Sequence, residues 1–155
     1  MRKGSRVALW GYNSANWLIS FFSIIRAGGT AVLLNYSMSC QDAGELLTMT
    51  ETGFLLCGNN SEMKTDPDAM RRLGDLAGIP SERCLDIRDG VLSFDPALME
   101  GTKEFDALEA RTPSEAGETA FIIFTSGTTS KPKAVQISQK ALTFDADAFK
   151  EKPRF

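Results

Sequence analysis

The first 58 residues alternate between short apolar segments and amphipathic ones, and few folds accommodate that order. Residues 6–11 (RVALWG), 30–35 (TAVLLN) and 54–58 (FLLCG) are almost continuously apolar, which is typical of strands covered on both faces. The segments between them carry apolar residues at helical spacing. A strand–helix–strand–helix–strand order with short connections calls for right-handed crossovers. We therefore predict an α/β fold with a mostly parallel sheet and helices on both faces.

Both connecting segments contain signals for where their helices begin and end. In the first, Asn13 or Ser14 can cap the helix, and the Gly28-Gly29 pair ends it. In the second, the stretch from Ser39 to Asp42 resembles a capping box, and the helix ends near Gly53. The first helix has an apolar stripe that we expect to pack against the sheet, formed by Trp17, Leu18, Phe21, Phe22 and Ile25.

The middle of the chain gives fewer signals. Residues 66–78 (DPDAMRRLGDLAG) predict a third helix. Residues 83–87 and 91–94 flank the turn-forming Asp89-Gly90 pair, which predicts a strand and a hairpin partner. Asp86 and Asp89 could suggest paired carboxylates, but a turn Asp needs no catalytic explanation.

The last third of the chain returns to the sheet. Residues 95–118 are acidic and poor in apolar residues, which predicts a loop or linker inside a single domain of residues 1–155. Further strands are expected at residues 120–124 and 135–137. A final helix should begin at Ser138, whose hydroxyl can cap it.

Composition excludes several classes of protein and of site. The net charge of -3 argues against nucleic acid as a partner. The absence of His removes Ser-His-Asp and Cys-His nucleophiles and the common zinc sites, so we predict no metal site. The three Cys residues fit neither a disulfide framework nor a CxxC site, and indicate packing in a reducing cytoplasm. The longest apolar-rich run, residues 17–25, is too short to span a membrane.

Residues 124–135 (FTSGTTSKPKAV) place a polar loop between two apolar strands. Gly127 allows backbone N–H groups to converge as an anion-binding nest, Pro132 stiffens the chain, and Lys133 supplies a point charge. The surrounding window, residues 121–144, holds three Lys and no acidic residue. Side-chain hydroxyls add further hydrogen-bond donors, from Thr125, Ser126, Thr128, Thr129 and Ser130.

Residue types alone leave two interpretations of this loop. A solvent-exposed hairpin uses the same residues, and neither GxxxxGK[ST] nor GxGxxG is present. The alternative is a phosphate-binding loop, in which either Lys131 or Lys133 faces the ligand because the two point apart across Pro132.

The order of residues favours phosphate binding. Residues 124–138 (FTSGTTSKPKAVQIS) resemble the signature loop of the AMP-forming, adenylate-forming enzymes: acyl-CoA synthetases, peptide-synthetase adenylation domains and luciferases. The family pattern is Tyr or Phe, TSGTTG, any residue, PKG and Val, then Ser or Thr and His. Residues 3–35 are similar to the family's opening, where a GDRVA strand leads to a helix, an AG stop and a strand ending in PLN. The resemblance implies a flavodoxin-like, doubly wound N-terminal subdomain.

In that family, the loop holds the β- and γ-phosphates of MgATP while a carboxylate attacks the α-phosphate, and a thiol then attacks the acyl-adenylate. The resemblance thus implies ATP and Mg²⁺, CoA or a carrier-protein thiol as acceptor, and a small-molecule carboxylate as substrate, as in fatty acid metabolism. It implies a catalytic, charge-stabilising role for Lys133. It implies nucleotide binding by Thr125, Ser126, Gly127, Thr128, Thr129, Ser130 and Lys133.

Three positions depart from the family pattern. Ser130 and Ala134 stand where the family has Gly, and either would constrain the loop if its position requires a positive φ. Gln139 replaces a His that the resemblance places near the acyl pocket, so this change bears on substrate handling.

The family's motifs for adenine, ribose and magnesium lie beyond Phe155. We therefore expect this chain to be the N-terminal part of a longer ligase and to lack complete adenylation activity alone. The competing interpretation is a non-catalytic α/β module used for binding or assembly. If a longer ligase covers this part, apolar surface at the sheet edge or at residues 144–149 is left bare and can pair two copies.

Overall fold

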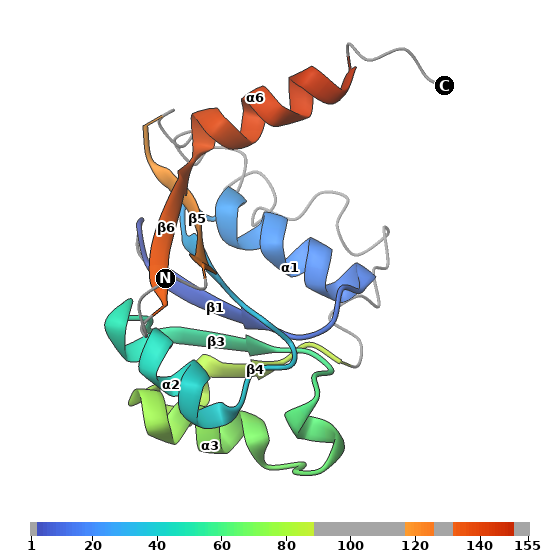
Figure 1. The fold of residues 1–155 in the computed structure, drawn as a ribbon, viewed down its shortest axis with the longest axis vertical. Helices are drawn as coiled ribbons and strands as arrows, with labels where there is room; N and C mark the ends of the chain where they lie inside the picture. Colours follow the sequence, from blue (N-terminus) through green and yellow to red (C-terminus); the bar gives the residue numbers. More distant parts are fainter. Residues whose placement is uncertain (1–2, 89–116, 126–131, 151–155) are drawn as a thin grey trace, which may run out of the picture.

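The computed structural model describes residues 3–88, 117–125 and 132–150, and its centre is a six-stranded sheet (Figure 1). The strand order is β4-β3-β1-β2-β5-β6. The sheet is parallel apart from the antiparallel pairing of β6 with β5. The strands are β1 (Arg6–Trp10), β2 (Thr30–Leu34), β3 (Phe54–Cys57), β4 (Cys84–Asp86), β5 (Thr119–Thr125) and β6 (Lys133–Ser138).

The helices cover the sheet from both sides, as predicted. Helix α1 (Ala15–Arg26) lies on one face, while α2 (Cys40–Met49) and α3 (Ala69–Ala77) pack against each other on the opposite face (Figure 1). The chain leaves β1 toward β2 and then crosses back to β3, and right-handed crossovers in opposite directions place helices on opposite faces. Two short 3₁₀ turns, η1 (Glu62–Lys64) and η2 (Ser81–Arg83), flank α3, and α6 (Gln139–Lys150) follows β6.

The predicted signals at the ends of α1 are confirmed. Ser14, rather than Asn13, caps the helix, because its hydroxyl oxygen accepts a hydrogen bond from the Trp17 N–H at 3.1 Å. The helix ends at Arg26, and Gly28 follows in a left-handed conformation with φ of 76°. A side chain at Gly28 would be strained there, which explains why the helix stops at this pair of glycines.

The other two predicted caps also form. The Ser39 hydroxyl accepts from the Asp42 N–H at 3.1 Å and donates to the Asp42 carboxylate at 2.7 Å. At the start of α6, the Ser138 hydroxyl accepts from the Ala141 N–H at 3.2 Å. Each contact satisfies a backbone donor that the first helical turn leaves unpaired.

The apolar stripe of α1 packs against the sheet only in part. Phe21 is buried and Trp17 and Ile25 are half-buried, but Leu18 and Phe22 are 50% and 53% exposed. Leu18 and Phe22 lie four residues apart on one ridge of the helix, and α1 contacts β1 and β2 along the neighbouring ridge. The expectation that the whole stripe joins the core is therefore wrong for these two residues.

The later strands are confirmed, with one part left untested. The strand predicted at residues 83–87 is β4, which pairs in parallel with β3. Its predicted hairpin partner at residues 91–94 lies outside the described residues, as does most of the predicted loop at 95–118. Strands β5 and β6 extend beyond the predicted bounds at 120–124 and 135–137.

Apolar side chains are exposed near both places where bare surface was expected. Leu85 on the edge strand β4 is 53% exposed, and Phe144 on α6 is 71% exposed. Within the described residues, no helix has the length and apolar character needed to cross a membrane.

Candidate functional site

The predicted phosphate loop joins β5 to β6, and the structure fixes both of its ends. Thr125 is the last residue of β5 and pairs with Lys133, the first residue of β6. Both residues are exposed, so hydroxyl and ammonium groups start from adjacent strands at the loop end of the hairpin. The other predicted loop residues lie outside the described ranges: Ser126, Gly127, Thr128, Thr129 and Ser130.

Ala134, which replaces a family Gly, occupies ordinary extended backbone. It lies in β6 and pairs with Phe124. Among the described residues, Glu51 is the sole non-glycine residue with a positive φ. Ala at position 134 thus imposes no backbone strain on the return strand, whereas position 130 lies outside the described residues.

The loop leaves the sheet at the edge where open α/β sheets bind ligands. Because β5 is parallel to β2 and β2 to β1, Thr125 lies at the carboxyl ends of all three strands. A cavity of about 590 Å³ lies at this edge. Its lining includes Gly11, Asn13, Trp17, Tyr36, Phe124, Thr125 and Pro132.

The connections after β1 and β3 are closed against each other at this edge. A Cβ on Gly11 would lie 2.9 Å from the Cα of Gly58, and the Tyr12 N–H donates to the Asn59 carbonyl at 2.6 Å. Such close backbone contact leaves no crevice there, and the cavity lies instead at the ends of β1, β2 and β5.

The turn after β2 is fixed by hydrogen bonds around Asn35. Its carbonyl accepts from the Trp10 indole N–H at 3.2 Å. Its side-chain oxygen accepts from both the N–H and the hydroxyl of Ser37, each at 2.9 Å. This Asx turn positions the next residue, Tyr36, at the cavity.

Tyr36 belongs to a column of three side chains. Its ring packs against Tyr12 with centroids 4.4 Å apart, and the Lys64 ammonium lies 5.1 Å from the centroid of the Tyr12 ring. The Tyr12 hydroxyl is 3.2 Å from the Ser61 hydroxyl, and its hydrogen bonds to Ser61 and to Lys64 lower the pKa of Tyr12. The sequence analysis did not single out Tyr12 or Tyr36; their position just after parallel strands was the available signal.

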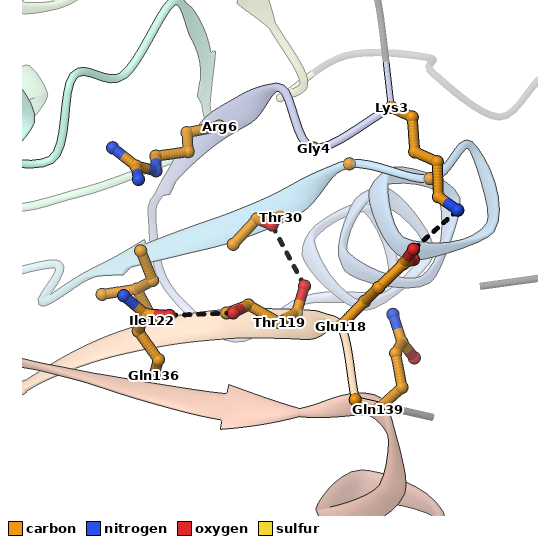
Figure 2. Close-up of a pocket in the computed structure, with 12 residues that line it drawn as sticks. Lys3, Gly4, Arg6, Thr30, Glu118, Thr119, Ile122, Gln136 and Gln139 are labelled. Carbon is orange, nitrogen blue, oxygen red and sulfur yellow. Dashed lines mark hydrogen bonds and ion pairs between the residues drawn. The ribbon is translucent and has the colours of Figure 1, made fainter. Parts of the chain in front are cut away.

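A second cavity, of about 520 Å³, lies at the opposite, amino edge of the parallel strands (Figure 2). Several of its polar side chains already have partners within its lining. Lys3 pairs with Glu118 at 2.6 Å, the Thr30 hydroxyl donates to the Thr119 carbonyl at 3.0 Å, and the Thr119 hydroxyl donates to Gln136 at 2.9 Å. These bonds tie β2, β5 and β6 together across the edge.

Gln139 lines this second cavity, and its backbone N–H donates to the Glu118 carbonyl at 2.8 Å (Figure 2). Because β6 runs antiparallel to β5, its last residues lie at the amino edge, roughly 20 Å from Lys133 along the strand. The structure therefore does not bring Gln139 into the site of the loop. A role for Gln139 in substrate handling stays a prediction.

The remaining ionisable candidates have structural partners. The Arg88 guanidinium binds the Asp86 carboxylate and lowers its pKa, whereas Asp89 lies outside the described residues. Burial raises the pKa of the Cys57 thiol to about 12 and that of Cys40 in the same direction. Both thiols are free and buried, which confirms their predicted role as packing residues. In the part of the chain described, no cluster of three or more Cys, Asp or Glu side chains could hold a metal ion.

Comparisons with known proteins agree with this arrangement. The model of the AMP-binding enzyme family matches residues 1–155. A crotonobetaine/carnitine–CoA ligase of Proteus mirabilis is 31% identical over 147 residues, which cover 93% of this chain and 28% of that protein. A long-chain-fatty-acid–CoA ligase of Drosophila melanogaster is 30% identical over 152 residues, or 91% of this chain and 22% of that protein. The chain thus spans less than a third of the length of these relatives.

Solved structures share the fold. An o-succinylbenzoate CoA synthetase of Bacillus subtilis, in complex with its acyl-adenylate intermediate, aligns with 99% of this chain and 35% of its own, at a TM-score of 0.60 and 24% identity. The N-terminal domain of FACL13 from Mycobacterium tuberculosis aligns with 99% of this chain and 36% of its own, at a TM-score of 0.66 and 21% identity. Since the family model covers the whole chain and the fold agrees, the protein belongs to the AMP-binding enzyme family.

Proposed function

We propose that this chain is the N-terminal part of an ATP-dependent, AMP-forming acyl-CoA synthetase. The complete enzyme would join a carboxylate to AMP and then transfer the acyl group to a thiol, with CoA as the acceptor. The observation that carries this proposal is the position of the family's loop motif. Its flanking residues Thr125 and Lys133 pair at the carboxyl edge of the sheet, beside a cavity. The ligase names of the relatives support the same reaction class.

The residues at this edge have the chemistry that pyrophosphate binding needs. The Thr125 hydroxyl and the exposed Lys133 ammonium start from paired positions, and the intervening segment is rich in Gly and hydroxyl residues. Bound MgATP would supply the adenylyl group for the carboxylate, with pyrophosphate as the leaving group. Lys133, with Thr125 and residues 126–130, would hold the β- and γ-phosphates and stabilise the charge that develops on departing pyrophosphate.

The finer assignments belong to the same proposal. An acyl-CoA synthetase of this kind would act in fatty acid or related acyl metabolism in the cytoplasm. The base and sugar contacts of the nucleotide would come from segments of a longer ligase, so the 155-residue chain should bind MgATP weakly. Catalysis of the full reaction would require those segments.

Nuclear magnetic resonance tests the phosphate site directly. We expect millimolar MgATP or magnesium pyrophosphate to shift the backbone amide signals of residues 125–130 and of Lys133. Lys133→Ala should abolish the shifts because it removes the charge. Lys140→Ala is the matched control, since Lys140 is an exposed Lys at the start of α6, beyond the end of β6 that is opposite to Lys133. Its removal should leave the shifts in place.

The result also separates the two interpretations of the chain. If pyrophosphate shifts no signal near Thr125, or if the two Lys variants behave alike, the loop does not bind phosphate in this chain. The non-catalytic binding or assembly module would then be the better description.

We further propose that the exposed apolar surface pairs two copies of this chain. Leu85 on β4 and Phe144 on α6 are the exposed residues that support pairing at the sheet edge or at α6. Sedimentation should show a concentration-dependent dimer that Leu85→Lys or Phe144→Lys weakens. A monomer at all concentrations would contradict the pairing.

A further inference from the structure

A third cavity, of about 310 Å³, lies on the face of the sheet that α1 covers. On this face α1 contacts β1 and β2, while α2 and α3 lie on the opposite face (Figure 1). The cavity extends beside α1 over β3 and the edge strand β4. Two cross-strand pairs form its floor, Val7 with Phe54 and Leu56 with Leu85. It shares no lining residue with the cavity at the carboxyl edge, so the two are separate sites.

Apolar side chains make up most of the lining of this third cavity. Ile24 of α1 and Ile87, which follows β4, are buried, whereas Leu85 is 53% exposed and forms the outer rim. The volume is at the lower end of the range of small-molecule sites. A cavity with apolar walls holds water poorly and can accept an aromatic ring. The walls therefore suit a small apolar group.

One buried hydroxyl in this lining has no partner in the protein. Ser20 of α1 is 4% exposed, and its side chain makes no hydrogen bond to the part of the chain that the structure describes. Every fully inaccessible side-chain nitrogen or oxygen in that part does have a partner. The Ser20 oxygen is therefore accessible, from the cavity that this residue lines. Because a buried hydroxyl without a partner costs stability, a ligand that bonds to it gains affinity.

The charged residues at this cavity are of opposite sign. Glu82 and Arg83 both line it, both are exposed, and both belong to η2, just before β4. The Arg83 guanidinium lies 5.3 Å from the centroid of the Phe54 ring, whose face attracts a cation. Neighbouring charges of opposite sign give the rim no net charge, so a charged ligand gains little from it. This arrangement favours a neutral ligand.

We propose that the third cavity binds a small neutral amphiphile, such as an alkylphenol. Its apolar ring would lie on Val7 and Leu56, and its hydroxyl would bond to Ser20. Both hydroxyls can donate and accept, so this hydrogen bond forms in either direction. The site goes beyond the proposed ligase function and uses none of the residues assigned to phosphate binding. Its test is therefore independent of that function.

Titrations of the 155-residue chain, followed by nuclear magnetic resonance, test this site with p-cresol as the probe. We expect p-cresol to shift the amide signals of Ser20, Ile24 and Leu56 saturably, with a Kd of about 1 mM. Toluene has the same ring without the hydroxyl, so it should bind about fivefold more weakly. p-Toluate carries a carboxylate in place of the hydroxyl and should bind no more tightly than p-cresol, because the rim has no net charge.

Ser20→Ala isolates the hydrogen bond. This variant should weaken p-cresol binding about fivefold and leave toluene binding unchanged, because the contacts of the ring remain. Without ligand it should unfold at a higher urea concentration, since Ala is the better helix former and no unpaired hydroxyl is buried. Phe22→Ala is the matched control on α1, because the exposed Phe22 ring does not line the cavity. The affinity for both probes should then stay the same.

The contrary outcomes separate the parts of the proposal. Equal binding of toluene and p-cresol, or equal weakening of both by Ser20→Ala, would overturn the hydrogen bond to Ser20. Tighter binding of p-toluate would overturn the neutral ligand class. If p-cresol shifts no signal of Ser20 or Leu56, or shifts that of Tyr36 instead, the cavity is not its binding site.

Discussion

The two cavities at opposite edges of the sheet differ in how their side chains are engaged. At the amino edge, Lys3 pairs with Glu118, and Thr30 and Thr119 donate to acceptors of neighbouring strands. At the carboxyl edge, the lining of the cavity is mostly aromatic and aliphatic, and one of its rings, Tyr36, stays exposed. The first edge uses its polar groups to hold strands together, whereas the second presents supported but uncovered surface.

This difference indicates which edge is available for binding. A polar group that already has a partner must break a bond before it can bind a ligand, and the gain is then small. A fixed and exposed ring gives up only contact with water when a ligand stacks on it. The polar cavity in Figure 2 is therefore explained as a structural junction, and the carboxyl edge as the place of function.

The largest expected effect comes from crowding the carboxyl edge. Gly11→Ala would place a Cβ 2.9 Å from the Cα of Gly58, so one of the two connections must move. We expect a loss of about 2–3 kcal/mol in the free energy of unfolding. The control is Gly53→Ala at the amino edge, where a Cβ meets nothing within 4 Å. Urea denaturation should show the control unchanged within about 1 kcal/mol; equal losses would mean that the contact between the connections is not tight.

Alkaline pH should lower the free energy of unfolding through the buried thiol of Cys57, the last residue of β3 at the carboxyl edge. Burial raises the pKa of Cys57 from 9.0 to about 12, so the folded chain keeps this proton longer than the unfolded chain. The contribution of Cys57 to stability is thus complete below pH 9 and is lost as pH rises toward 12. By pH 10 the loss should be about 1 kcal/mol. Denaturation midpoints measured between pH 8 and 10 should fall less steeply in Cys57→Ala; an unchanged slope would exclude Cys57 as the cause.

At the amino edge, a single buried hydroxyl should have a smaller effect. Thr30 is buried, and Thr30→Val removes the bond from its hydroxyl to the Thr119 carbonyl. We expect a loss of about 1 kcal/mol in unfolding free energy. Thr48→Val is the comparison, because the Thr48 side chain is exposed and bonds only within its own helix, to Gly44. If thermal unfolding shows no difference between the two variants, β2 and β5 are not held together by Thr30.

The local features of this fold could be predicted from the sequence, because their causes are local. Ser14 and Ser39 cap helices through N–H groups three residues away, and apolar runs identify buried strands wherever they occur. The contact of Tyr12 with Tyr36 could not be predicted, since it depends on which connections meet at the sheet edge. The distance of Gln139 from the loop could not be predicted for the same reason, because its location follows from the antiparallel direction of β6.

The smallest expected effect is that of the ion pair at the amino edge. Lys3 and Glu118 are 2.6 Å apart, but the Lys3 side chain is 53% exposed, so water and salt screen the attraction. Lys3→Ala and Glu118→Ala, combined in a double-mutant cycle, should give a coupling free energy below about 1 kcal/mol. The coupling should shrink further at 1 M salt, where the screening length falls to about 3 Å. A coupling that is larger and independent of salt would mean that this edge excludes water, and its cavity would then become a binding site as credible as the carboxyl edge.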